Sequence, residues 1–191
     1  MLFPVKRLRM KLAAVAVAAL SITFLAAGSA MAGTSSHAKT VSGNEYLYGA
    51  LYGKAALAQT PTIPLQLWGL VRTHGKFTPS TSSAATIPTP KGKLDAFQVS
   101  SGTSSAKISK HCFAVFNQNF PVKVTGGTGV FWHASGKGRA NLRFTGYVPR
   151  YTSGPHKGQC NENSNPTTAR GASESLYVQI TPMTIVVHRH H

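Results

Sequence analysis

The feature that most constrains the fold is an alternation of apolar and polar residues on both sides of a glycine-rich stretch. The stretch reads GGTGVFWHASGKG and spans residues 126–138. Apolar and polar side chains alternate before it, from residue 120 to 125, and again after it, from residue 139 to 148. A period of two places successive side chains on opposite faces of a strand. The pattern therefore predicts two strands, each with one face in a core and one in water, joined by a hairpin-like connection at 125–138.

The rest of the chain shows further strand signals and almost no helical ones. Apolar runs that are typical of strands occur at 65–71, 93–99, 107–116, 175–180 and 183–187. The Ser/Thr/Pro-rich segment 79–90 indicates a connection, and the polar segment 150–171 a long loop. Pro182 marks a bulge, an edge or a break. These signals predict an all-β domain over residues 62–191, folded as an antiparallel barrel of six to eight strands.

The N-terminus has the pattern of a secretory signal peptide at residues 1–32. Four basic residues precede an apolar segment at 12–27, and Ala30-Met31-Ala32 forms a small-x-small cleavage site. We therefore expect a secreted, extracytoplasmic protein with no transmembrane segment after cleavage. Residues 33–61 are expected to be a flexible segment, in which the apolar spacing at 45–58 predicts a weak helix or a docking arm.

Two cysteines are present, Cys112 and Cys160. Disulfides persist in the compartments that exported proteins reach, so a single structural bridge between them is the expected arrangement. There is no Cys-x-x-Cys motif, and no His lies at zinc-finger spacing from a Cys pair. The eight His residues are dispersed along the chain. We expect neither a metal site nor a cofactor.

The sequence also argues against several kinds of enzyme. A phosphate-binding loop requires Ser or Thr after Gly-Lys, whereas Gly136-Lys137 is followed by Gly138. A glycosidase requires two facing carboxylates, and only four acidic residues are scattered along the chain. No catalytic residues are assigned, and a non-catalytic protein is the favoured interpretation.

The glycine-rich stretch resembles a family signature. Gly126-Gly127-Thr128-Gly129-Val130-Phe131, followed by Ala134-Ser135-Gly136 and Gly138, is similar to the GGTG-x-F-x-x-A-x-G motif of dirigent and allene oxide cyclase-like proteins. The resemblance implies an eight-stranded antiparallel barrel with an apolar or aromatic small ligand. Trp68, Leu142 and Phe144 would then line the ligand site, unless they only fill the core. A cyclase-type enzyme is a weaker alternative.

The charge balance suggests a different function. Beyond the signal peptide, sixteen Lys and Arg residues stand against four acidic residues. Such an excess favours contact with anionic polymers through long-range attraction, although it would also keep an exported protein soluble. Lys123, Lys137, Arg139 and Arg143 lie on the predicted outward positions of the two alternating strands. The alternative hypothesis is thus a basic envelope-associated protein that binds anionic polymers through these four side chains, without a specific nucleic-acid partner.

Overall fold

The structure is a computed structural model that describes residues 38–79 and 83–188. The predicted signal peptide at 1–32 lies outside the described residues. The described chain forms nine strands: β1 (Ala38–Tyr52), β2 (Ile63–Gly69), β3 (Thr73–Phe77), β4 (Ala84–Thr89), β5 (Gly92–Gln98), β6 (Thr103–Ile108), β7 (Phe113–Gly127), β8 (Ser135–Tyr147) and β9 (Ser173–His188). Two short 3-10 helices, η1 (Gly53–Leu57) and η2 (Gly129–Phe131), complete it.

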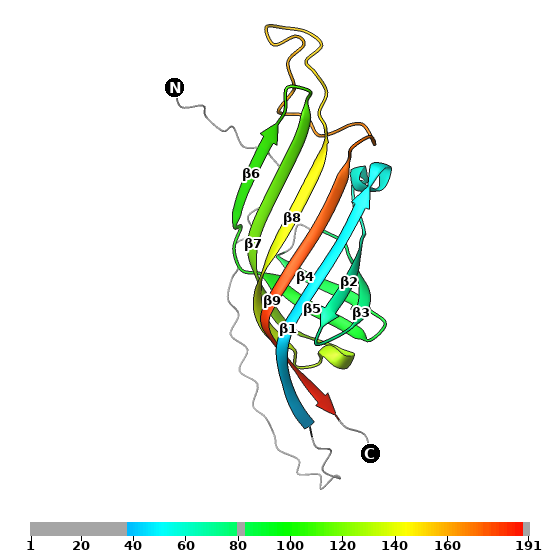
Figure 1. Cartoon of the computed structure of the whole chain (residues 1–191), viewed down its shortest axis with the longest axis vertical. Coiled ribbons are helices and arrows are strands. Elements are labelled where there is room, and N and C mark those ends of the chain that lie inside the picture. Colours follow the sequence, from blue (N-terminus) through cyan, green and yellow to red (C-terminus); the bar gives the residue numbers. More distant parts are fainter. Residues whose placement is uncertain (1–37, 80–82, 189–191) are drawn as a thin grey trace, which may run out of the picture.

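The strands form one antiparallel sheet that curls into a nearly closed barrel. Their order is β3-β2-β1-β9-β8-β7-β5-β4, and the end strands β3 and β4 lie next to each other. The strand β7 pairs with β5 through one half of its length and with β6 through the other half. Figure 1 shows the consequence: β2 to β5 enclose the lower part, and the long strands β1, β7, β8 and β9 extend above it together with β6. Among the described residues, no helix has the length and apolar character needed to cross a membrane.

The glycine-rich stretch forms the predicted connection between two paired strands. Phe120 of β7 lies opposite Ala140 of β8, and η2 lies between the two strands. Gly127 has a φ of 153°, and a Cβ atom there would lie 1.9 Å from the carbonyl oxygen of Lys93 on β5. This glycine therefore allows two backbones to approach closely at a barrel corner. The all-β fold is confirmed, and the connection expected at 125–138 is present at 128–134, because β7 extends to Gly127 and β8 begins at Ser135.

The expected helix at 45–58 is wrong. Residues 38–52 form β1, which pairs with both β2 and β9, and only Gly53–Leu57 forms a 3-10 helix. Glu45 and Leu47 are buried, whereas Tyr46 and Tyr48 lie on the outer face, which is the period of a strand. The barrel therefore includes residues 38–52, which lie before the expected start at residue 62. The segment 79–90, expected to be a connection, contains β4.

The core fills the closed part of the barrel. The large apolar side chains that are almost completely buried come from η2 and from β1, β2, β5, β7 and β9: Phe131, Leu47, Ile63, Leu65, Leu94, Ile180, Met183 and Val124. Phe131 belongs to the connection between β7 and β8. The predicted hairpin connection therefore also contributes a buried side chain to the core at its own end of the barrel.

The predicted disulfide is present. Cys112 lies immediately before β7 and is bonded to Cys160, with a Cα–Cα distance of 5.2 Å. Cys160 belongs to the long loop between β8 and β9. The bond therefore ties that loop to the start of β7, as the sequence predicts.

Candidate functional site

The expected ligand-lining residues do not share one cavity. Leu142 and Phe144 are on the inner face of β8 and are half-buried, and Leu142 packs against the core. Trp68 lies on the outer face of β2, where 38% of its surface is exposed and its ring stacks on Tyr46. Trp68 therefore cannot line the barrel interior with the other two. Its outward position follows from the burial of Leu67 and Leu65 in the core, which turns residue 68 outward.

The barrel interior holds two carboxyl groups that are far apart. Glu45 is fully buried, and burial raises the pKa of its carboxyl, although the N–H groups of Val71 and Leu70 act in the opposite direction. Burial also raises the pKa of Glu174. Glu45 pairs with Ile180, six positions along β9 from Glu174, so about 20 Å of strand separates them. The two acids of a glycosidase lie within roughly 10 Å, so these two are not such a pair.

Glu45 stabilises the turn between β2 and β3 through its side chain. Its Oε2 accepts a hydrogen bond of 2.9 Å from the Val71 N–H, which holds the turn between β2 and β3. Its Oε1 is buried without a hydrogen-bond partner in the described part of the chain. Within residues 38–79 and 83–188, no three His, Cys, Asp or Glu side chains gather as a group that could hold a metal ion.

The four cations singled out in the sequence share the outer face of β7 and β8. Lys123 lies directly opposite Lys137 in the register of the two strands, Arg139 lies opposite Pro121, and Arg143 lies opposite Asn117. All four side chains are exposed. We call Lys123, Lys137, Arg139 and Arg143 the basic strip. Its two lysines also line an open depression of about 390 Å³ with Ser135, Gly136, Thr181, Pro182 and Thr184.

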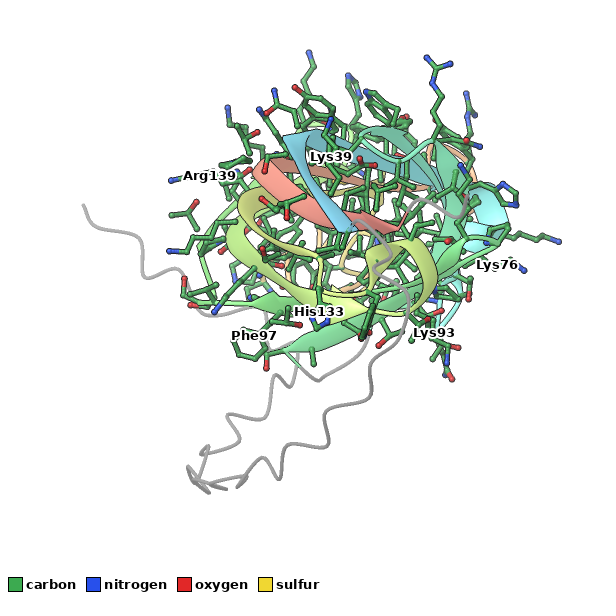
Figure 2. The ribbon with its side chains drawn as sticks, turned by 90° about the horizontal axis from the view of Figure 1, so that it is seen from below. Lys39, Lys76, Lys93, Phe97, His133 and Arg139 are labelled. Atoms are coloured by element: carbon green, nitrogen blue, oxygen red, sulfur yellow. A yellow bond between two sulfur atoms is a disulfide. The ribbon has the colours of Figure 1, made fainter. Side chains whose placement is uncertain are left out.

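The surface charge around this strip is almost all positive. Every Lys and Arg in the described ranges is exposed, and none of them forms an ion pair with a described carboxylate. Two of the four acids, Glu45 and Glu174, are buried in the barrel. Figure 2, a view of the barrel from below, shows Arg139, Lys76 and Lys93 directed away from it at separate points around the circumference. Among the described residues, therefore, no paired carboxylate offsets the charge of the basic strip.

A second feature of the outer face was missed by sequence reasoning. Tyr46 and Tyr48 of β1, Trp68 of β2 and Tyr177 of β9 all point outward on three adjacent strands. The expectation of a helix at 45–58 concealed the two tyrosines on β1. The alternation of Glu45, Leu47 and Gly49 with Tyr46 and Tyr48 was the signal that could have found them.

Comparison with protein-family models, with curated proteins and with solved structures finds no match to this chain. The resemblance of residues 126–138 to dirigent and allene oxide cyclase-like proteins therefore stays a prediction.

Proposed function

We propose that this protein is an extracytoplasmic binding protein that holds anionic polymers on the outer face of its barrel through the basic strip. The observation that carries the proposal is the pairing of Lys123 with Lys137. The two lysines face each other across neighbouring strands, and like charges in directly opposite positions are destabilising. An anionic group bound between them would relieve this repulsion.

The strip extends beyond this pair. Arg139 and Arg143 continue along β8 on the same face, so several anionic groups of one polymer can be bound at once. Guanidinium groups bind carboxylates and phosphates through two parallel hydrogen bonds, which favours such binding. The signal-peptide pattern and the disulfide support a location outside the cytoplasm, where anionic polymers of the cell envelope are available.

A small apolar ligand inside the barrel has less support. The interior of the closed part is occupied by side chains such as Phe131, Leu94 and Ile63, each with no exposed surface. An eight-stranded barrel is just wide enough to be filled in this way.

The test is retention of the purified protein on immobilised poly-L-glutamate in a gradient of NaCl. Lys123→Gln/Lys137→Gln should elute at a clearly lower salt concentration than the wild type. The matched control is Lys54→Gln/Lys157→Gln, which removes the same charge from exposed positions in η1 and in the loop between β8 and β9. Equal reductions of retention in the two variants would contradict a defined site and leave only the net charge as the cause.

A further inference from the structure

Four neighbouring aromatic side chains, of which three are exposed and Tyr46 is half-buried, form a group on the outer face beside the basic strip. Tyr46 lies opposite Trp68, and their rings stack with centroids 5.8 Å apart and an interplanar angle of 18°. Tyr48 lies opposite Tyr177 on the other side of β1. The exposed fractions are 44% for Tyr48 and 38% for both Trp68 and Tyr177. We call these four residues the aromatic platform, because exposed aromatic groups of this kind mark interaction sites rather than a core.

Side-chain amides surround the platform in the same rows of the sheet. Gln66 lies opposite Tyr48 on β2, and Gln179 lies opposite Tyr46 on β9. Asn141 of β8 lies opposite Tyr177, and its Nδ2 donates a hydrogen bond of 2.8 Å to Asn119 Oδ1. Each amide offers both a donor and an acceptor next to an aromatic ring. This combination suits a ligand that has apolar ring faces and hydroxyl groups at their edges.

Cations flank the platform on two sides but are scarce within it. Arg139 and Arg143 of β8 lie opposite Gln179 and Ser175 of β9. On the far side, Arg72 lines an open depression of about 380 Å³ together with Trp68 and Gln66. Within its described length, β9 carries no Lys or Arg. The distance along the sheet from Trp68 to Arg139 is three inter-strand spacings, about 14 Å, which a short oligosaccharide spans.

The positions of these cations distinguish between two classes of polymer that could bind here. A single-stranded nucleic acid stacks its bases on aromatic rings, but it carries one phosphate per nucleotide and is held by cations that follow its whole backbone. Here the cations lie at the two sides of a platform whose centre holds amides and hydroxyls. The arrangement suits a chain in which charged units alternate with neutral ones.

We propose that the aromatic platform and the basic strip together bind an acidic polysaccharide in which carboxylate-bearing sugars alternate with neutral sugars. The apolar faces of the sugar rings stack on Tyr48, Trp68 and Tyr177. The amides of Gln66, Gln179 and Asn141 bind their hydroxyl groups, and Arg139 and Arg143 bind the carboxylates. This inference rests on the proposed function, because the platform adds selectivity for sugars to a face that already attracts anions.

The experiment compares three polyanions of matched charge by titration calorimetry: hyaluronan oligosaccharides, poly-L-glutamate and single-stranded oligo-dT. The variant Tyr48→Ala/Tyr177→Ala should weaken hyaluronan binding at least tenfold and change poly-L-glutamate binding less than twofold. The control Tyr52→Ala removes an outer-face tyrosine of the same strand that is 70% exposed and lies beyond the platform. Both polymers should bind this control as they bind the wild type.

A spectroscopic readout locates the binding site. The chain has two tryptophans, so Trp132→Phe leaves Trp68 as the only one. Its emission should shift on addition of hyaluronan oligosaccharides and stay unchanged with poly-L-glutamate.

The outcomes distinguish the two proposals. No binding of any polyanion by the wild type would refute the proposed function itself. Binding of all three polyanions with equal weakening in the platform variant would refute only the sugar selectivity. Tighter binding of oligo-dT that depends on the platform would assign the face to nucleic acid instead. A wild-type dimer that Tyr48→Ala/Tyr177→Ala converts to a monomer would show that a second copy of the chain covers the platform, and would also overturn the inference.

Discussion

Removal of the disulfide should lower the stability of the barrel by an amount that follows from its position in the chain. Cys112 and Cys160 are 48 positions apart. In the chain-entropy description, closing a loop of this length stabilises the folded state by about 4 kcal/mol at 25 °C, because it restricts the unfolded chain. Small domains have total stabilities of roughly 5–15 kcal/mol. The double variant Cys112→Ser/Cys160→Ser should therefore lose a large share of its stability.

The fold should nevertheless survive this change. The loop retains hydrogen bonds of its own, including one of 2.9 Å from the Tyr151 N–H to the Gln159 carbonyl and one of 3.2 Å from Arg150 to the Lys110 carbonyl. Cys112 has a φ of 63°, and Ser meets the same backbone restriction, so the substitution adds no new strain there.

The assay is urea unfolding of the wild type and the double variant, followed by far-UV circular dichroism. With an m-value of about 2 kcal/mol/M, a destabilisation of about 4 kcal/mol corresponds to a midpoint lower by about 2 M. Wild-type protein in the presence of a reducing agent is the control and should behave like the variant. A destabilisation below about 1 kcal/mol would refute the entropic reasoning and indicate that the loop is already restricted in the unfolded state.

Two further predictions concern the buried acid and the glycine corner. The pKa of Glu45 is raised in the folded protein, so protonation of this side chain stabilises the fold at low pH. This stabilisation is lost as the pH rises from the ordinary pKa of 4.5 through the raised pKa of the folded state. The free energy of unfolding of Glu45→Gln should equal that of the wild type in acid and exceed it increasingly as the pH rises, in unfolding curves taken across this range. The same trend in Glu162→Gln, at an exposed position, would contradict the assignment of the effect to the buried Glu45. Gly126→Ala should cost about 1–3 kcal/mol of stability from backbone strain, since a Cβ there meets no atom within 4 Å. Gly127→Ala should lose more stability than Gly126→Ala in urea unfolding, because its Cβ would also collide with the Lys93 carbonyl oxygen. An equal loss in the two variants would show that backbone strain alone matters.

The sequence predicted correctly those parts of the fold whose local pattern is compatible with only one structure. Alternation around Phe120 and Ala140 required one buried and one exposed face, so the β7–β8 pair and the outward direction of the basic strip followed from it. Cys112 and Cys160 are the only two cysteines of the chain, so their bond followed from the compartment.

The parts that were missed depend on pairing between distant segments. Leu47 and Leu51 of β1 are compatible with both a helix and a strand, and the strand is selected by pairing with β9. The edge strand β4 contains Pro88, which is tolerated at an edge because no second neighbour needs its N–H. Alternation along β2 places Trp68 on the outside, but only the register between β1 and β2 shows that it lies beside Tyr46. The same register assembles the aromatic platform, which no single segment of the sequence contains.

If the basic strip binds anionic groups directly, the salt dependence of binding measures how many of its cations take part. The logarithm of the binding constant for poly-L-glutamate should fall linearly with the logarithm of the NaCl concentration, because each bound anionic group releases a counterion. If both lysines bind, the magnitude of this slope should decrease by about 1.5 in Lys123→Gln/Lys137→Gln, since each lysine accounts for about 0.7–0.9. The slope of Lys54→Gln/Lys157→Gln should equal that of the wild type. A slope that is the same in both variants would show that Lys123 and Lys137 do not bind the polymer directly.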